Sequence, residues 1–366
     1  MQITCNCNNL ILATGLILAL GNAQSALAFS NMYVFGDSLS DSGNLFTWTD
    51  QDNPVTGGIP IPVAPPYFSG RFQNGPSYAE GLWTHLGLTN NLIPSYLGGT
   101  NYAVGGARSY YHAFDLNSGL PPTGSPAFAG FSLTGQLAAY NSYNAAHATS
   151  VDPNALYVVW SGANDVNDVL TMAGSGLYSQ AQISDQMTSA VTGVASVVSS
   201  LVANGAKELL VPTLPNLGLT PSAIAQGAQL PGQLFSGSFN ASLDLALAPI
   251  LANPDVNLIR FDVFSLLSTL VENPGSYGFS NVSDPCLQNF YVNASLNAGP
   301  VTVCSAPDDY LFWDIVHPSA QTHEILALEM AAAVPEPESY ALMLAGLGLL
   351  GFMARRRVHM SQVAGA

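Results

Sequence analysis

Residues 32–44 read Met-Tyr-Val-Phe-Gly-Asp-Ser-Leu-Ser-Asp-Ser-Gly-Asn, an apolar run that stops at a glycine and continues with short polar side chains. A β-branched and aromatic run that ends at Gly36 is typical of a buried strand followed by a tight turn. This pattern places Ser38 just beyond the strand, where a nucleophile would be displayed. A serine after a glycine is usually a turn residue or a helix cap, so Ser38 alone does not define a site.

A carboxylate and an imidazole lie three residues apart near the other end of the chain, in Asp314-Ile315-Val316-His317-Pro318. The residue before a proline is disfavoured in the helical region, so we expect His317 on an extended loop with its ring free. A serine hydroxyl becomes a nucleophile when a base takes its proton and a third group orients that base. Ser38, His317 and Asp314 are the residue types that these roles require, and they form a candidate catalytic triad.

Four blocks of the sequence, taken in order, resemble the GDSL or SGNH family of hydrolases. They are Gly36-Asp37-Ser38-Leu39, Asn101-Tyr102-Ala103-Val104-Gly105-Gly106-Ala107, Gly162-Ala163-Asn164-Asp165 and Asp314-x-x-His317-Pro318. The resemblance implies a carboxylic ester hydrolase that acts through an acyl-enzyme. It also implies an oxyanion hole made by the backbone N–H groups of Ser38 and Gly106 and the side-chain amide of Asn164, with Gly105 as the alternative to Gly106.

Strand-like and helix-like stretches alternate between these blocks. The strand candidates are Met32–Phe35, Thr100–Val104, Leu156–Trp160, Glu208–Pro212 and Val256–Phe261, and the helix candidates are 76–87, 131–147, 178–203, 238–251 and 319–333. The alternation predicts one α/β domain, a three-layer α/β/α sandwich with a mainly parallel five-stranded sheet. The resemblance implies the flavodoxin-like SGNH hydrolase fold. Ligands of such sheets bind outside the carboxyl ends of the strands, where Ser38, Gly106 and Asn164 would meet.

The first 28 residues are typical of a secretory signal peptide. An apolar stretch, Leu10–Leu20, precedes Ala26-Leu27-Ala28, which fits the small-x-small pattern of a signal peptidase site. The segment before the apolar stretch has no Lys or Arg, which is atypical, and an uncleaved anchor is the alternative. The apolar stretch is short for a membrane span, which favours cleavage before Phe29.

Residues 334–358 carry a second targeting signal. Val334-Pro335-Glu336-Pro337-Glu338-Ser339 precedes an apolar segment, 340–354, and then Arg355-Arg356-Arg357. This order resembles the PEP-CTERM sorting signal of Gram-negative bacteria, with a short transmembrane helix and cytoplasmic arginines. It implies transient membrane association, recognition by an exosortase-type enzyme, and a mature protein in the cell envelope or outside the cell. The alternative for this tail is a plain membrane anchor. Under either interpretation, residues 29–333 form the predicted hydrolase domain.

The region between the two signals is acidic. Residues 29–334 contain 21 acidic and four basic residues, which excludes a nucleic acid partner because no basic patch can form. Cys5 and Cys7 leave with the signal peptide, so Cys286 and Cys304 remain as a plausible disulfide in an oxidising compartment. No histidine or other cysteine lies near them at ligand spacing, so we expect no metal site and no other cofactor.

Several polar residues near the four blocks have structural interpretations. Asp37 and Asp41, and likewise Asp165 and Asp168, are expected to cap helices or fix turns, and His323 is expected to be a surface or capping residue. The connection from Trp48 to Phe72 is too long for an ordinary loop, so it either shapes a pocket or covers the surface.

The leading functional interpretation is an exported serine esterase or lipase that acts on small-molecule, lipid or polysaccharide esters. A polysaccharide O-acetyl esterase and an acyltransferase are alternatives within the same family. A non-catalytic matrix or surface binding protein on the same fold is the alternative from another class. Retention of Ser38, Asn164, Asp314 and His317 argues against a binding protein, which would not need all four.

Overall fold

The computed structural model describes residues 29–50, 58–110, 131–290 and 300–334, together with Gly346 and Gly348. The chain divides into two units, one of Phe29–Val334 and one of Met1–Ala28 with Pro335–Ala366. The predicted signal peptide lies outside the described residues, and so does the predicted C-terminal apolar segment except for those two glycines.

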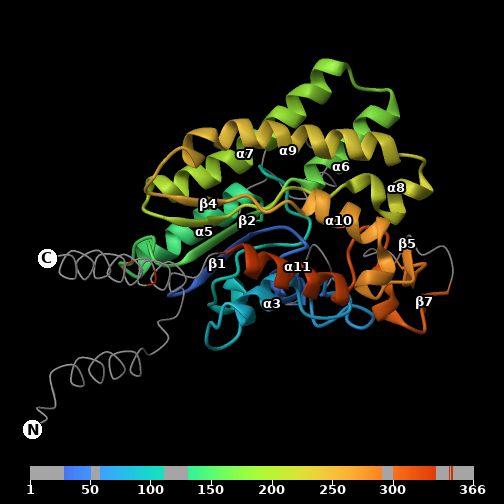
Figure 1. The fold of residues 1–366 in the computed structure, drawn as a ribbon, viewed down its shortest axis with the longest axis horizontal. Helices are drawn as coiled ribbons and strands as arrows, with labels where there is room; N and C mark the ends of the chain where they lie inside the picture. The colour runs from blue at the N-terminus through green and yellow to red at the C-terminus, as the bar shows by residue number, and fades with distance from the viewer. Residues whose placement is uncertain are drawn as a thin grey trace, which may run out of the picture. The chain divides into compact units, whose positions relative to one another are not determined.

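A parallel four-stranded sheet forms the centre of the unit Phe29–Val334. Its strands are β1 (Met32–Gly36), β2 (Leu156–Trp160), β3 (Glu208–Leu210) and β4 (Asn257–Ile259), in that spatial order (Figure 1). β1 and β2 pair in register over their whole length, from Met32 opposite Leu156 to Gly36 opposite Trp160. Every residue of β2 is buried, as expected for a strand covered on both faces, which explains its continuous apolar sequence.

The expected fifth strand is only partly formed. Residues 100–104 run along the free edge of β1, where Tyr102 N donates to Val34 O at 2.7 Å and Val104 N donates to Gly36 O at 3.2 Å. Among the described residues, this segment and β1 share one parallel bridge pair, Val34 with Asn101. The ladder is interrupted because the Gly36 N–H donates to Gln136 Oε1 at 2.9 Å and not to this segment.

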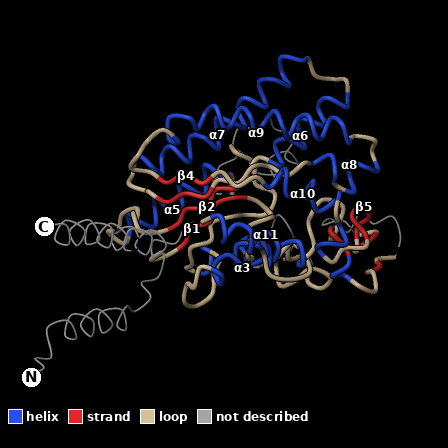
Figure 2. Tube along the Cα trace, in the orientation of Figure 1, coloured by secondary structure: helices blue, strands red, loops and turns tan. Residues whose placement is uncertain are grey.

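Helices cover both faces of the sheet (Figure 2). In the figure α7 and α9 lie on one side, and α3 and α11, which pack on each other, lie on the opposite side. This arrangement confirms the predicted α/β class with helical layers above and below a parallel sheet. The helix bounds are α2 Asn44–Asp50, α3 Tyr78–His85, α5 Leu133–Ala146, α6 Ala163–Ser175, α7 Gln180–Ala203, α8 Pro221–Ala225, α9 Gln229–Leu251, α10 Val263–Glu272 and α11 Ala320–Ala333.

Within the described residues, α7 and α9 are long and apolar enough to cross a membrane, by length and composition alone. One face of each helix is buried inside the domain: Ile183, Val194 and Val198 on α7, and Phe239 and Leu243 on α9. The core of the sandwich therefore accounts for their apolar composition.

Short strands beside the main sheet carry the chain toward Asp314. β5 (Asn281–Pro285) pairs in parallel with β8 (Tyr310–Phe312), and β6 (Leu287–Gln288) pairs antiparallel with β7 (Thr302–Val303). Cys286 and Cys304 form a disulfide with their Cα atoms 4.9 Å apart, close to β6 and β7. Cys286 N donates to Phe312 O, and Leu287 N donates to Trp313 O at 2.7 Å, so the disulfide-linked strands hold the residues that precede Asp314.

Candidate active site

Ser38, His317 and Asp314 lie in one hydrogen-bonded row. His317 Nε2 is 2.8 Å from Ser38 Oγ, and His317 Nδ1 is 2.7 Å from Asp314 Oδ2. Ser38 follows the end of β1, and the other two residues follow β8. Asp314 Oδ1 accepts the backbone N–H groups of Val316 and His317 at 2.8 and 2.7 Å, which folds the loop so that carboxylate and ring face each other.

A tyrosine that the sequence did not single out completes this row. Tyr67, in the long connection before α3, donates its hydroxyl to Asp314 Oδ2 at 2.6 Å. Burial favours the neutral carboxyl, but the charge of His317 and hydrogen bonds from His317, Tyr67 and Val316 hold the pKa of Asp314 below its usual value. Burial and the Asp314 charge raise the pKa of Tyr67, so its hydroxyl remains a donor. Asp314 is therefore ionised and can stabilise a protonated imidazole.

Phe72 packs between His317 and the glycine block. Its ring centroid is 5.3 Å from that of His317, with the rings inclined at 40°. On its other side the ring lies against Gly105, where a Cβ atom would come within 2.2 Å of it. Gly105 thus leaves the space that Phe72 needs to pack beside the imidazole, and the long connection shapes the site through Tyr67 and Phe72.

The predicted oxyanion donors differ in their hydrogen bonds and in their relation to the cavity beside Ser38. Asn164, in the first turn of α6, donates one N–H to Ala107 O at 3.0 Å, and its carboxamide has a second N–H. Gly105 N donates to Asp41 Oδ2 at 2.8 Å. Among the described residues, no protein acceptor takes the backbone N–H of Ser38 or of Gly106. Ser38 and Asn164 line one cavity, whereas Gly106 lies outside its lining.

Buried carboxylates hold the turn that presents Ser38. Asp37 Oδ1 accepts the Leu39 N–H at 3.1 Å, and burial raises the pKa of Asp37 to about 6. Asp41 accepts the N–H groups of Gly43, Asn44 and Leu45 at the start of α2. Both aspartates therefore have the turn and capping roles predicted for them.

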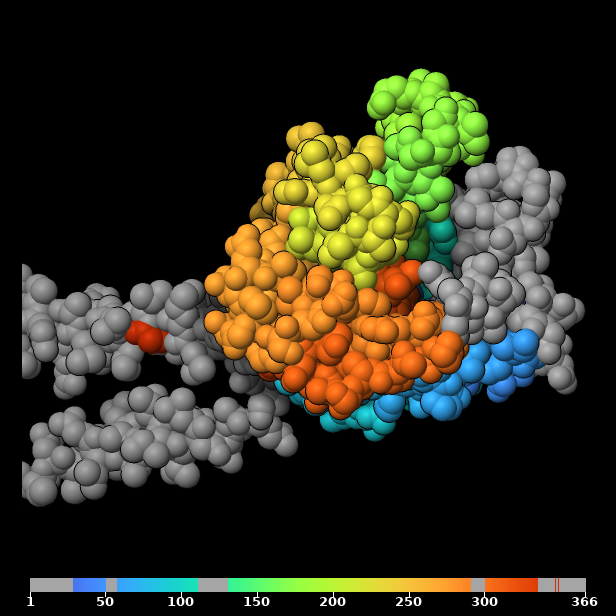
Figure 3. All heavy atoms as spheres, turned by 90° about the vertical axis from the view of Figure 1, so that its right-hand side faces the viewer, coloured from blue at the N-terminus to red at the C-terminus, as the bar shows by residue number. Residues whose placement is uncertain are grey.

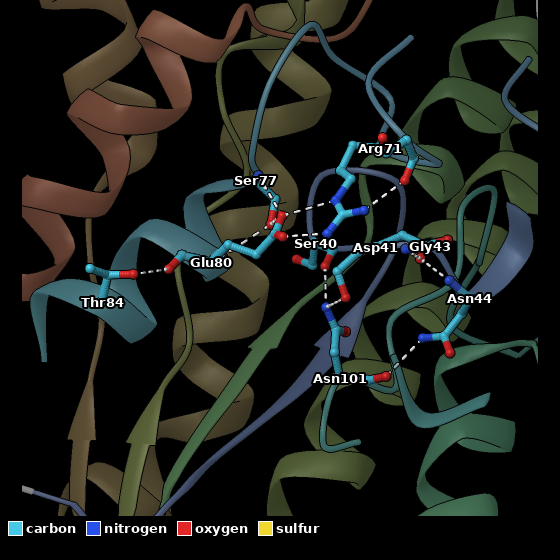
Figure 4. Close-up of polar contacts among 11 residues, drawn as sticks. Ser40, Asp41, Gly43, Asn44, Arg71, Ser77, Glu80, Thr84 and Asn101 are labelled. Carbon is cyan, nitrogen blue, oxygen red and sulfur yellow. Dashed lines mark hydrogen bonds and ion pairs between the residues drawn. The ribbon is translucent and has the colours of Figure 1, made fainter. Parts of the chain in front are cut away.

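Two asparagines join this turn to the glycine block (Figure 4). Asn44 Nδ2 donates to the carbonyls of Asn101 and Ala103 at 2.7 and 2.8 Å. Asn101 Nδ2 in turn donates to Ser40 O at 2.7 Å. All of these groups are buried, so the serine turn and the oxyanion segment are held as one rigid piece.

An ion pair fastens the connection that carries Tyr67 and Phe72. Figure 4 shows Arg71 between Glu80 of α3 and the chain near Gly43. The Arg71 guanidinium bonds both Glu80 carboxylate oxygens, and its Nη1 donates to Ser69 O at 2.6 Å. Glu80 also accepts the N–H of Ser77, the N-cap of α3, so the connection is anchored to a helix end.

Asp165 and Asp168 have structural roles, but they do not cap α6, whose N-cap is Gly162. Arg108 makes a two-pronged ion pair with Asp168, with distances of 3.0 and 2.9 Å. Ser109 N donates to the buried carboxyl group of Asp165, and burial raises the pKa of that group to about 7. Both aspartates tie the segment after the glycine block to α6.

The expectation of a surface or capping role for His323 is wrong. His323 is 1% exposed in α11, and its Nδ1 accepts the Tyr78 N–H of α3 at 3.0 Å. Burial lowers its pKa to about 3, with a further contribution from His317. The close packing of α11 on α3 explains the burial, and His323 is a neutral core residue.

A cavity of about 690 Å³, including the space at its open mouth, begins beside Ser38, Asn164 and His317. Its lining continues into leucine and phenylalanine side chains of α10, α11 and β8. Figure 3 shows this face hollowed between the yellow and lime elements and the orange elements, with the orange-red chain around residues 310–320 in the hollow. Within the described residues, no cluster of three or more His, Cys, Asp or Glu could hold a metal ion.

Comparison with known proteins gives two family matches. Residues 32–330 match the family model described as GDSL-like lipase/acylhydrolase. Residues 333–357 match the PEP-CTERM protein-sorting motif.

Curated relatives are similar over most of this chain. Lipase 1 of Photorhabdus luminescens is 27% identical, over 91% of this chain and 54% of its own length. An uncharacterized protein of Pseudomonas putida is 29% identical, over 85% of this chain and 50% of its own length. The chain therefore spans about half the length of these two relatives. The phosphatidylcholine-sterol acyltransferase of Aeromonas hydrophila is 28% identical over 88% of this chain and 94% of its own.

Solved structures are more distant. An acetylxylan esterase, Axe2 of Geobacillus stearothermophilus, is 14% identical over 84% of this chain and 95% of its own, with a TM-score of 0.40. A lipolytic G-D-S-L protein of Veillonella parvula is 13% identical, over 82% of this chain and 94% of its own, with a TM-score of 0.38.

Proposed function

This chain belongs to the GDSL-like lipase/acylhydrolase family, and we propose that it hydrolyses carboxylic esters with Ser38 as nucleophile, His317 as base and Asp314 as the group that orients the base. The observation that carries the proposal is the continuous row from Ser38 Oγ through both ring nitrogens of His317 to Asp314 Oδ2. Such a row lets one imidazole accept and return a proton while a carboxylate stabilises its charged form.

Acylation begins when Ser38 Oγ attacks the ester carbonyl carbon and its proton passes to His317 Nε2. The carbonyl oxygen becomes an oxyanion, which the N–H groups of Ser38 and Gly106 and the Asn164 amide stabilise. We assign Gly106 rather than Gly105 because Asp41 already accepts the Gly105 N–H. The tetrahedral intermediate then expels the alcohol, which takes the proton from His317 and leaves an acyl group on Ser38.

Deacylation repeats these steps with water. His317 takes a proton from the water as its oxygen attacks the acyl carbonyl, and the same donors stabilise the second oxyanion. Collapse releases the carboxylic acid and returns the proton to Ser38 Oγ. No step requires a cofactor.

Acyl transfer to an alcohol is the second candidate function. The relative from Aeromonas hydrophila, which this chain covers over 94% of its length, is named as an acyltransferase. The triad chemistry is the same, with an alcohol in place of water in the second step. Hydrolysis in the presence of increasing glycerol separates the two, because a transferase forms acylglycerol at the expense of free acid.

We propose that the protein acts after export. The PEP-CTERM match at 333–357 supports sorting to the cell surface of a Gram-negative bacterium. Residues 1–28 would be removed by a signal peptidase and the tail by an exosortase-type enzyme near Pro335, leaving a hydrolase domain of residues 29–333. Mass spectrometry of the protein recovered from its host tests both cleavage positions.

The proposed activity is tested with purified wild-type protein and its Ser38→Ala variant on p-nitrophenyl esters. A Ser142→Ala variant is the matched control, because Ser142 is exposed on α5, where its hydroxyl only bonds Ala138 O. We expect wild type and control to turn over ester equally and Ser38→Ala, with an unchanged circular dichroism spectrum, to be inactive. Activity retained by a folded Ser38→Ala variant would contradict the assignment, and no hydrolysis by wild type would favour the binding-protein alternative.

A further inference from the structure

The cavity beside Ser38 changes in character along its length. At its mouth are the polar groups already assigned to catalysis, Ser38, Asn164 and His317. Its far end is lined by apolar side chains that are almost fully buried. These are Val263, Leu267 and Leu270 of α10, Phe312 of β8 and Leu326 of α11.

The apolar end lies within a hydrophobic cluster of the domain. Leu267, Leu270 and Phe312 also pack with Phe279 and Leu311 in this cluster. Leu270 and Phe312 are each 1% exposed and Leu326 is 3% exposed, so this end is closed to solvent. Thr220 and Thr322 also line the cavity, but their hydroxyls already donate to Leu217 O and Leu311 O. An apolar ligand therefore gains by filling the space beside the leucine and phenylalanine side chains.

α10 gives the cavity its length. Val263, Leu267 and Leu270 recur at four and three residues and therefore share one face of the helix. Seven residues of α-helix separate the first from the last, a distance of about 10 Å along the helix axis. This apolar stripe is much longer than an acetyl group and matches an extended medium-length alkyl chain.

We infer that this cavity binds the acyl chain of the substrate and that the enzyme prefers medium-chain acyl esters to acetyl esters. The inference rests on the proposed function, because it places the chain by its covalent bond to Ser38. The acyl group stays attached between the two steps and fits a closed end. The alcohol must leave after the first step and therefore needs an open path to solvent.

The test varies the acyl chain at constant leaving group. Purified protein is assayed on p-nitrophenyl acetate, butyrate, octanoate and palmitate at substrate concentrations below micelle formation. Each buried methylene strengthens binding by an amount that corresponds to roughly a fourfold gain in kcat/KM. With six added methylenes buried, kcat/KM should rise roughly four thousandfold from acetate to octanoate, and it should fall for palmitate, which exceeds the cavity.

Two substitutions at Leu266 test the cavity directly. Leu266 lines it from α10 and is only partly buried, so the site tolerates a larger side chain better than the core does. Leu266→Trp is expected to lower kcat/KM for octanoate at least tenfold more than it lowers kcat/KM for acetate. Leu266→Ala is expected to move the optimum to a longer chain, which keeps the test informative if the tryptophan variant does not fold. Leu245→Trp, at an exposed position on α9, is the matched control and should keep the wild-type profile.

The outcomes separate this inference from the proposed function. If acetate is hydrolysed as fast as octanoate, or if the Leu266 variants keep the wild-type chain-length profile, the protein is still an esterase and the acyl-site inference is wrong. A second comparison uses acetate esters of increasingly long alcohols. The inference is also wrong if kcat/KM rises with the length of the alcohol and Leu266→Trp removes that rise, because the cavity would then bind the alcohol. If no ester is turned over at all, the proposed function fails and the inference fails with it.

Discussion

Tyr67 and His317 share one oxygen of Asp314, and this shared contact predicts a specific effect of Tyr67→Phe. A hydrogen bond to a buried charge contributes about 1.5 to 3 kcal/mol, so we expect the variant to lose about that much stability at pH 7. The pKa of Asp314 is held below its ordinary value of 3.8 in the folded state. Its contribution to stability is therefore present above that value and lost as the pH falls below it.

The measurement for Tyr67→Phe is urea unfolding at several pH values. The difference from wild type should be full at pH 7 and should narrow as the pH falls below 3.8 and through the lower pKa of Asp314 in the folded state, until the carboxyl is protonated in both states. A gap that stays constant with pH would assign Tyr67 a packing role only. Tyr96→Phe, at an exposed tyrosine, is the control and should match wild type throughout.

Asn164 and Asn167 lie one turn apart on α6, and both line the cavity. Only Asn164 is assigned to the oxyanion, and loss of one such donor lowers kcat by about a hundred- to a thousandfold. We expect Asn164→Ala to show this loss with little change in KM, and Asn167→Ala to stay within a few-fold of wild type. The test measures kcat and KM of both variants on one ester. Equal losses of kcat in Asn164→Ala and Asn167→Ala would contradict the oxyanion role of Asn164.

Asp165 gives a pH-dependent prediction of the opposite sign. Burial raises its pKa from 3.8 to about 7, against the attraction of Arg108. Between these values the folded state keeps a proton that the unfolded state releases, so this contribution to stability falls as the pH rises. Asparagine cannot ionise, so the stability of Asp165→Asn relative to wild type should rise by up to about 1.4 kcal/mol for each pH unit in that window. Urea unfolding from pH 4 to 7.5 measures it, with exposed Asp185→Asn as a control that shows no such trend.

At the scale of elements, the turn from β2 into α6 has no room for a side chain at Gly162. Gly162 has a φ of +119°, and a Cβ atom there would come within 2.4 Å of the Phe239 ring of α9. Gly162→Ala would strain the backbone and push α9 away from the helix that carries Asn164. We expect a loss of stability of about 1 to 3 kcal/mol with a fall in kcat, measured by thermal unfolding and kinetics. Gly174→Ala, with open space around its Cβ position in the same helix, should be neutral or stabilising.

Elements with a regular apolar period were predictable from the sequence. The prediction of a helix over 178–203 is confirmed by α7, which begins after Ser179 with a capping box and ends at Ala203. α9 begins at Gln229, earlier than the predicted helix 238–251. The apolar pattern did not predict its first turns, because Gly232, which packs closely against Gly218, lies there in place of an apolar side chain. The strand predicted at 100–104 is only partly formed, and this could not be predicted because it depends on the Gln136 side chain of α5, which accepts the Gly36 N–H.

The candidate site was predictable only where chemistry fixes the residue type. Ser38, Asp314 and His317 could be found because nucleophile, base and orienting acid are a recognisable set, and the structure brings them together. Tyr67 and Phe72 could not, because one hydroxyl and one ring in a long connection resemble ordinary core residues. The length of that connection was the only signal. The buried state of His323 depends on how α11 packs on α3, which no local pattern reports.

At the scale of the whole molecule, charge imbalance predicts a response to salt. Residues 29–334 contain 21 acidic and four basic residues, and Arg71, Arg108 and Arg260 are each paired with one carboxylate. The remaining acids repel one another, and raising ionic strength from 0.01 to 0.15 M shortens the screening length from about 30 to about 8 Å. We expect the Tm at pH 7 to rise by about 2 to 4 °C, the change that about 1 kcal/mol produces in a domain of this size.

Differential scanning calorimetry in a series of NaCl concentrations measures this response. The control is the same series at the isoelectric point of residues 29–334, where net repulsion vanishes. This pH is lower than the value of 4.3 for the whole sequence, because the region lacks the three arginines at 355–357. There the Tm should change little with salt. A Tm that is independent of salt at pH 7 would mean that the acidic residues are too far apart to matter.

The row from Ser38 to Asp314 joins the two ends of the folded unit, and this has a consequence for the timing of activity during biosynthesis. Ser38 lies nine residues after the first residue of the unit, Phe29, whereas Asp314 and His317 come directly before its last helix. A ribosome therefore synthesises the proposed nucleophile long before the proposed base. A growing chain that ends before residue 317 has the serine but no imidazole beside it, so it cannot hydrolyse esters by the proposed mechanism.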